Sequence, residues 1–138
     1  MLGEAVKARQ AATHAFTEAK SLRCTMDFQQ YVNSRQYNGN LIFDHQEQKL
    51  DIIVNPSKTN QGKEIKDLKS LSGGERSFST VAFLLSLWSI VESPILFLDE
   101  FDVFMDQINR TYAMDLIVSA AKESLNGQYV FLTPQEMG

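Results

Sequence analysis

The chain has 138 residues, a formal net charge of −4, 43% hydrophobic residues and a single cysteine, Cys24. This length and apolar content suit one domain with a core of its own, and the negative balance excludes a protein drawn to nucleic acid by an overall basic field. A lone cysteine forms no intramolecular disulfide, which fits a reducing compartment. No apolar run approaches the ~20 residues of a membrane-spanning helix, so we expect no membrane partner.

The first quarter of the chain predicts one long helix over residues 3–36. This stretch contains no proline and, after Gly3, no glycine, and it is rich in alanine, glutamine, lysine and arginine. Small and apolar residues recur in it at alternating separations of three and four, as in the seam of a coiled coil. These seam residues are Ala5, Ala8, Ala12, Ala15, Ala19, Leu22 and Met26.

A second apolar set on the same helix also needs cover, and it is concentrated near the helix end: Val6, Phe16, Phe28, Tyr31 and Val32. Two interpretations remain open. The helix is either one strand of a coiled coil whose partner strand is missing here, because an isolated strand is marginal in water, or an amphipathic helix that lies on its own domain.

Two short strands are predicted next, over residues 40–44 and 49–55, after a break at Asn38-Gly39. The polar turn 45–48 between them predicts an antiparallel hairpin. Apolar residues alternate along the second strand, so at least one face of the hairpin should be buried. We expect His45 to be an exposed turn residue.

The polar stretch 56–69 predicts a loop with a local basic patch formed by Lys58, Lys63, Lys66 and Lys69. Such a patch is either a solvated face or a contact with the phosphates of DNA or a nucleotide.

A glycine turn then opens a helix at Leu71-Ser72-Gly73-Gly74-Glu75-Arg76. Gly73 and Gly74 lack a Cβ, so the backbone can turn sharply there and approach a ligand closely. Ser72 is a good N-cap candidate for an amphipathic helix over residues 75–91. The first N–H groups of a helix have no partner within it and sit at the positive end of its dipole, so a phosphate fits there.

The run Ile95-Leu96-Phe97-Leu98 is apolar at every position and ends in Asp99 and Glu100. Such a run predicts a strand covered on both faces in a parallel sheet, and ligands of these sheets bind beyond the carboxyl ends of the strands. An aspartate at that place can hold Mg²⁺. A glutamate beside it can polarise an attacking water.

A further helix is predicted over residues 107–125, and either Asp102 or Asp106 can cap it. Its inward side should carry Ile108, Tyr112, Leu116, Ile117 and Ala120. Asn126-Gly127 ends this helix, and 128–132 predicts a last buried strand.

These motifs carry a family resemblance. Residues 71–75 resemble the signature motif of ATP-binding-cassette (ABC) ATPases, 95–100 resemble a Walker B strand with its catalytic glutamate, and Phe104-Met105-Asp106 occupies the place of the D-loop. In this order and spacing they resemble the C-terminal half of the ATPase head of the structural maintenance of chromosomes (SMC) family.

The resemblance implies an α/β fold. We expect the C-terminal lobe of an ABC-type head over 37–138, mainly a parallel sheet flanked by helices, with a β-hairpin before it. A coiled-coil neck helix over 1–36 would precede both.

The resemblance also implies site roles. In the family two heads sandwich two ATP molecules. Asp99 would help to hold Mg²⁺, Glu100 would orient the attacking water, and Asp106 would sit at the seam between the heads. The residues that would meet ATP held by the opposing head are Leu71, Ser72, Gly73, Gly74, Glu75 and Arg76.

Two features of the family are missing. The chain has no Gly-x-x-x-x-Gly-Lys-Ser/Thr phosphate loop, so it resembles half of a bipartite head that should not hydrolyse ATP alone. The histidine that many cassette ATPases place after the last strand is replaced by Thr133-Pro134. SMC heads commonly lack this histidine, so its absence does not predict inactivity.

The partners implied are the chain's own N-terminal head lobe, an SMC-five-like partner head, a kleisin subunit at the neck, and DNA through the assembled complex. The implied setting is nuclear and chromosome-associated, in genome maintenance and recombinational repair. Two alternatives stay open: the lobe of another ABC ATPase, such as a coiled-coil repair ATPase or a transporter domain, and a non-hydrolysing platform that binds protein or DNA.

Overall fold

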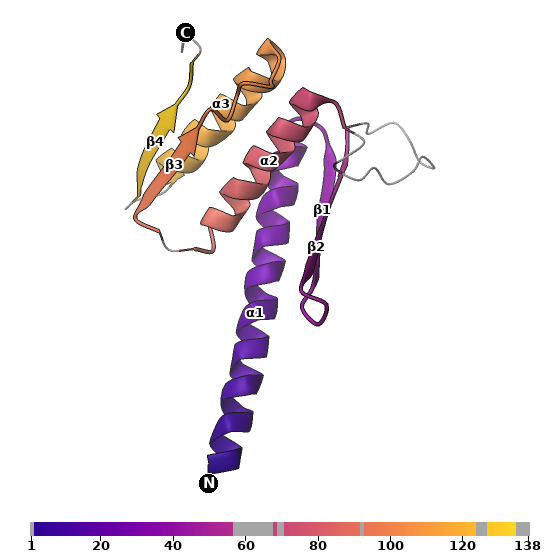
Figure 1. Cartoon of the computed structure of the whole chain (residues 1–138), viewed down its shortest axis with the longest axis vertical. Coiled ribbons are helices and arrows are strands. Elements are labelled where there is room, and N and C mark those ends of the chain that lie inside the picture. Colours follow the sequence, from indigo (N-terminus) through magenta and orange to yellow (C-terminus); the bar gives the residue numbers. More distant parts are fainter. Residues whose placement is uncertain (1, 57–67, 69–70, 92, 124–126, 135–138) are drawn as a thin grey trace.

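The molecule consists of one long helix that carries a small head at one end (Figure 1). The computed structural model describes residues 2–56, 68, 71–91, 93–123 and 127–134. Helix α1 (Leu2–Asn33) spans 32 residues, and only Cys24, Phe28 and Val32 of it are buried. The predicted helix is therefore confirmed, although it ends three residues earlier than expected, in a turn where Gln36 has a positive φ of 62°.

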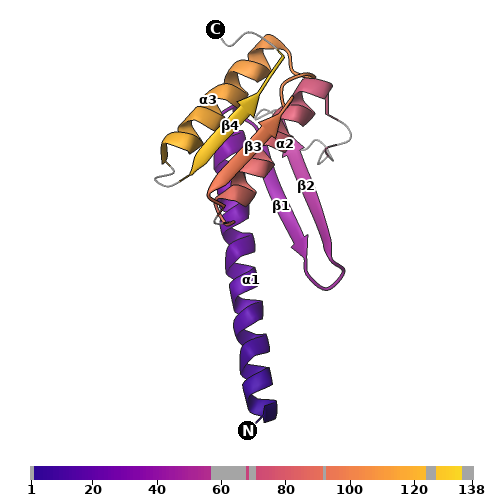
Figure 2. The same cartoon turned by 60° about the vertical axis from the view of Figure 1, so that its left-hand side comes forward.

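An antiparallel hairpin follows and lies along the head end of α1 (Figures 1 and 2). It pairs β1 (Asn38–Asp44) with β2 (Lys49–Asn55), with Leu41 opposite Ile52. The predicted hairpin is confirmed. The expected break at Asn38-Gly39 is wrong, because both residues already belong to β1, and Gly39 is where the strand approaches Val32 of α1 closely.

The rest of the head alternates helices and strands: α2 (Gly73–Trp88), β3 (Ile95–Asp99), α3 (Gln107–Glu123) and β4 (Gln128–Leu132). Strands β3 and β4 are parallel, with Ile95 opposite Gln128 and Asp99 opposite Leu132. In Figure 2 both strands lie in front of α2 and α3. One continuous core joins the last turns of α1 to the hairpin, α2, β3 and α3.

Only one face of β3 is covered, which corrects the prediction of a strand buried on both faces. Leu96 and Leu98 are buried, whereas 48% of Ile95 and 66% of Phe97 are exposed. Among the described residues, cover for this sheet comes from its α2 and α3 side, so the apolar side chains of the opposite face meet solvent.

Helix α3 also differs from its prediction. Ile108 and Tyr112 are exposed, although Leu116 and Ile117 are buried as expected. Asn109 and Arg110 are buried in their place, because the carboxylates of Asp106 and Asp102 provide partners for their polar groups. A hydrophobic periodicity cannot reveal buried polar residues of this kind.

Two predictions concern residues outside the described ranges: the basic patch of the four lysines in the 56–69 loop and the helix stop at Asn126. In the described part of the chain, no helix has the length and apolarity to span a membrane.

Candidate functional site

The N-terminus of α2 is capped by its own side chains, as the sequence predicted. The hydroxyl of Ser72 accepts a hydrogen bond from Glu75 N at 3.4 Å, and Glu75 Oε2 accepts one from Ser72 N at 2.9 Å. This reciprocal capping box fixes the first turn of the helix. Ser72 and Gly73 are exposed, so the turn faces solvent in a rigid form.

The residues on either side of this turn anchor it to the head. Leu71 is buried in the core, and Arg76 Nε donates a hydrogen bond to the carbonyl oxygen of Leu68 at 3.2 Å. Arg76 therefore supports the chain that leads into the turn, a structural role distinct from the contact with ATP that the resemblance implies for it.

The turn packs against the segment that precedes α3. A methyl carbon placed on Gly74 would lie 2.6 Å from Asn109 Nδ2, whereas one on Gly73 would meet nothing closer than the carbonyl oxygen of Phe104 at 3.8 Å. The absence of a side chain at Gly74 thus allows the turn to contact the start of α3 in the same chain. The sequence predicted a close approach of the backbone to a ligand at this turn.

Asp106 is the cap of α3, which settles the choice between Asp102 and Asp106. Its Oδ1 accepts hydrogen bonds from Asn109 N at 2.7 Å and from Asn109 Nδ2 at 3.0 Å. The backbone hydrogen bond from Asn109 lowers the pKa of Asp106 below its usual value, and the positive charge of Arg35 lowers it further by a smaller amount. Asp106 therefore stays ionised beside the α2 turn.

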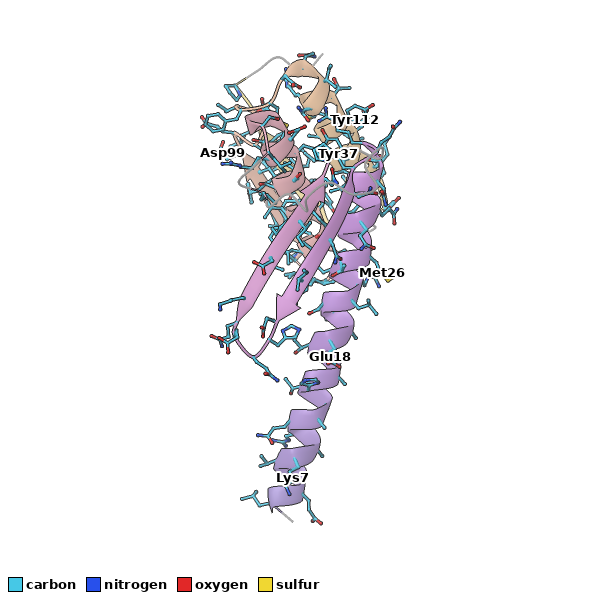
Figure 3. All side chains as sticks on the ribbon, turned by 90° about the vertical axis from the view of Figure 1, so that its right-hand side faces the viewer. Lys7, Glu18, Met26, Tyr37, Asp99 and Tyr112 are labelled. Carbon is cyan, nitrogen blue, oxygen red and sulfur yellow. The ribbon has the colours of Figure 1, made fainter. Side chains whose placement is uncertain are left out.

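Asp99 and Glu100 lie at the carboxyl end of β3, at the head end of the molecule, where Figure 3 labels Asp99. Both are exposed. Glu100 has a positive φ of 49°, and its N–H donates to the carbonyl oxygen of Leu132 at 2.9 Å. A non-glycine residue in the left-handed region marks a strained position of the kind found at functional sites.

Two features of the site were missed by the sequence analysis. Asp102, fully buried, is held by Arg110 and Thr133. The guanidinium of Arg35 lies over three rings, with its Cζ 5.0 Å from the centroid of Tyr37, 5.7 Å from Phe78 and 5.3 Å from Tyr112.

No spacing rule joins these residues, because they come from five segments: the turn after α1, helix α2, the turn after β3, helix α3 and the residue that follows β4. Tyr112, which the sequence predicted on the inward side of its helix, is exposed and lies beside Arg35 instead.

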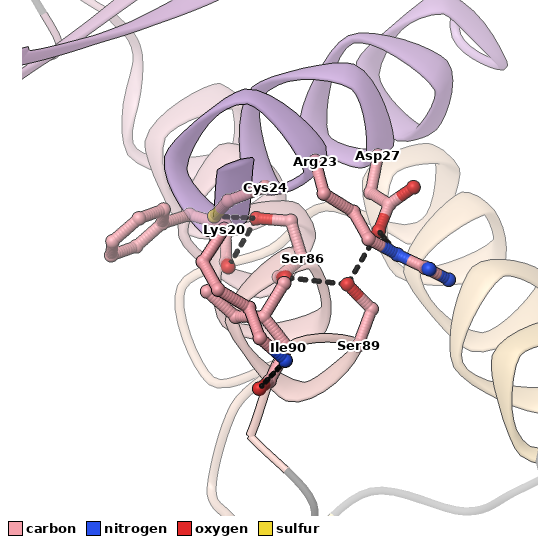
Figure 4. Close-up of polar contacts among 8 residues, drawn as sticks. Lys20, Arg23, Cys24, Asp27, Ser86, Ser89 and Ile90 are labelled. Atoms are coloured by element: carbon pink, nitrogen blue, oxygen red, sulfur yellow. Dashed lines mark hydrogen bonds and ion pairs between the residues drawn. The ribbon is translucent and has the colours of Figure 1, made fainter. Parts of the chain in front are cut away.

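The other end of α2 is bound to α1 through polar contacts (Figure 4). Lys20 Nζ donates to the carbonyl oxygen of Ile90 at 3.1 Å, and the Sγ of Cys24 lies 3.4 Å from Ser86 Oγ. Ser89 Oγ donates to Asp27. Burial raises the pKa of the Cys24 thiol, as expected for a small packed residue. Helix α2 thus joins the glycine turn at one end to the long helix at the other.

The carboxylates could supply only part of a metal site. In the described ranges no three residues among His, Cys, Asp and Glu are grouped as metal ligands. Asp99 offers a single exposed carboxylate, which matches Mg²⁺ bound mainly through water and nucleotide phosphates.

The chain matches known proteins along nearly its whole length. It is 47% identical over 137 residues to structural maintenance of chromosomes protein 6 of Homo sapiens, and 36% identical over 137 residues to the protein of the same name from Saccharomyces cerevisiae. Each match takes in 99% of this chain. The chain belongs to the SMC family.

This SMC chain spans 12% of each of these two relatives, in their C-terminal head portion. No protein-family model matches it.

Solved SMC heads share the fold. The Smc head bound to the C-winged helix domain of ScpA aligns with a TM-score of 0.68 at 25% identity, over 94% of this chain and 39% of that one. The Pyrococcus furiosus Smc head with an extended coiled coil aligns with a TM-score of 0.66 at 26% identity, over 94% and 31% of the two chains. The predicted α/β head fold and the family resemblance are confirmed.

Proposed function

We propose that this SMC chain is the C-terminal half of an ATPase head, which binds and hydrolyses ATP once it is joined to its N-terminal lobe and a partner SMC head. One observation carries the proposal. The capped glycine turn of α2 and the Phe104–Asp106 segment are packed into one unit through Gly74 and Asn109. A four-residue turn that begins with Glu100 joins this segment to β3, which ends at Asp99.

The exposed end of α2 suits a phosphate. Ser72 and Gly73 are accessible, the first turn is rigid, and the positive end of a 16-residue helix lies behind it. In the proposed head, the turn from Leu71 to Arg76 contacts the γ-phosphate of ATP held by the opposing head. Asp106, ionised beside the turn, lies at the seam between the heads.

The two carboxylates at the end of β3 suit the hydrolysis of ATP. Asp99 would hold Mg²⁺ together with the phosphates of the nucleotide bound by its own head. Bound there, Mg²⁺ supplies charge neutralisation on the transferred phosphoryl group. Glu100 would orient the attacking water and accept its proton. Because phosphoryl transfer depends on positioning and charge stabilisation, this division of groups between two heads ties turnover to their engagement.

The other proposed partners are supported by the sequence and by the comparisons with known proteins. The sequence contains no phosphate loop, which supports a separate N-terminal lobe as its source. The solved Smc head bound to a domain of ScpA supports a kleisin-type partner. The likeness to chromosome-maintenance relatives supports an SMC-five-like partner head and action on DNA in the nucleus, in genome maintenance and repair.

The test is Glu100→Gln in the full-length protein within its complex, with Glu47→Gln as a matched control in the exposed hairpin turn. We expect ATP turnover to fall about 10²-fold or more, while ATP-dependent association of the heads persists, because the neutral amide still fits but accepts no proton. Glu47→Gln should change neither. Turnover that survives Glu100→Gln unchanged would show that another group is the base.

A further inference from the structure

The turn after β3 is anchored from inside by one buried carboxylate. Asp102 is fully buried, its Oδ2 accepts a hydrogen bond from Thr133 Oγ1 at 2.6 Å, and the same oxygen lies 2.9 Å from Arg110 Nε. Arg110 is 9% exposed, so this ion pair is screened from water. We refer to Asp102, Arg110 and Thr133 as the buried triad.

The buried triad ties three segments together at the proposed reaction centre. Asp102 lies two residues after Glu100, Thr133 directly follows β4, and Arg110 lies in the first turn of α3. Glu100 is itself bonded to the same end of β4, through its N–H and the carbonyl oxygen of Leu132. The backbone around Glu100 is therefore fixed to the β4 end by two bonds on consecutive residues, Leu132 and Thr133.

These two bonds account for the strained backbone of Glu100. With a φ of 49°, Glu100 has a conformation that a non-glycine residue keeps only where its surroundings hold it. A freed turn would relax to an unstrained φ, and the carboxylate would then point in another direction.

Stability alone does not explain a buried aspartate here. A buried ion pair is often no more stabilising than well-packed apolar residues, and Asp102 Oδ1 is buried without a hydrogen bond in the described part of the chain. Such a group carries a desolvation cost. A role in fixing geometry accounts for its presence better than a role in holding the fold together.

We propose that Asp102, through Thr133 and Arg110, is a positioning residue that sets the direction of the Glu100 carboxylate. The inference rests on the proposed ATPase function. Thr133, the residue after β4, then contributes to the catalytic geometry without contact with nucleotide. This is the place where many cassette ATPases have a histidine and this chain has a threonine.

The test is Thr133→Val in the full-length protein within its complex, because valine keeps the shape of threonine and removes only the hydroxyl. We expect kcat to fall about ten- to a hundredfold, as for a small misplacement of a catalytic group. The KM for ATP and ATP-dependent head association should stay within about twofold. Thr133→Ser, which restores the hydroxyl, should recover kcat, and Thr111→Val on the exposed side of α3 is the matched control.

Three results would overturn the inference alone: kcat of Thr133→Val equal to that of the unsubstituted complex, a loss that Thr133→Ser does not recover, or a parallel loss of head association, which would indicate a structural role. An unsubstituted complex without any ATP turnover would overturn the proposed function as well. The two failures are therefore distinguishable.

Discussion

At the scale of single residues, the two adjacent glycines of the α2 turn differ in what surrounds them. Gly73 is exposed and has space for a side chain, whereas Gly74 is pressed against the buried amide of Asn109. Asn109 in turn donates to Asp106. A sequence motif presents both glycines alike, but only Gly74 couples the turn to the start of α3.

We therefore expect Gly74→Ala to lower the free energy of unfolding by about 1–3 kcal/mol, because the added methyl group must displace Asn109 from its hydrogen bonds. The matched control Gly73→Ala should change it by no more than about 0.5 kcal/mol. Urea unfolding of the assembled head measures both. Equal effects of the two substitutions would mean that the contact with Asn109 carries no energy.

The residues of the site were only partly predictable. Ser72 as the cap of α2 follows from local chemistry, since serine before a helix with glutamate three residues later is a capping box. Asp102 could not be distinguished from Asp106 in this way. The hydrogen bonds that Asp106 accepts from Asn109 identify it as the cap. The different role of Asp102 depends on Thr133, 31 residues away, and a contact of that separation leaves no local pattern.

At the scale of elements, α1 uses its two apolar sets differently. Phe28 and Val32 are fully buried against the head, whereas Leu22 and Met26 of the predicted seam are 64% and 60% exposed. The helix thus packs on its own domain at one end and presents its seam to solvent along the rest. Each of the two interpretations drawn from the sequence describes one part of the helix, and the coiled-coil partner stays a prediction.

Tyr31 gives the packing of α1 a pH dependence. Burial, reinforced by the carboxylates of Asp27 and Glu123, raises the pKa of Tyr31 to about 12. The folded head favours the neutral phenol, so this stabilisation is complete below pH ~10, the ordinary pKa of tyrosine, and is lost as pH rises toward 12.

We expect the free energy of unfolding of the assembled head to decrease between pH 10 and 12 in part because of Tyr31. Tyr31→Phe should make that decrease smaller, since phenylalanine has no proton to lose. Urea unfolding at several pH values in this window measures the slope. An identical slope with and without the substitution would contradict the buried environment of Tyr31.

At the scale of the whole molecule, the element order was predictable, because each helix and strand has its own periodicity and stop signals. The fold class followed from the family resemblance. The uncovered face of the β3–β4 sheet was not predictable. The apolar run of β3 predicted cover on both sides, and Ile95, Phe97 and Leu132 are about half exposed or more. The sequence of β3 is suited to a larger sheet than the described residues form.

An exposed apolar face of this kind promotes association, and in our account the N-terminal lobe covers it. We expect Phe97→Glu to prevent co-purification of the chain with a separately expressed N-terminal lobe, because a charge would be buried there. Val103→Glu, on the exposed turn beyond β3, is the control. Undiminished binding by the Phe97 variant would show that the lobe docks elsewhere.

The central claim is that this chain supplies half of a composite ATPase site, and ATP hydrolysis by three samples tests it most directly: the chain alone, the chain with its N-terminal lobe, and both lobes with the partner head. We predict full turnover only in the third sample, because the α2 turn acts on the nucleotide of the opposing head. Turnover by the chain alone would contradict the account, since it would require a phosphate site within these 138 residues.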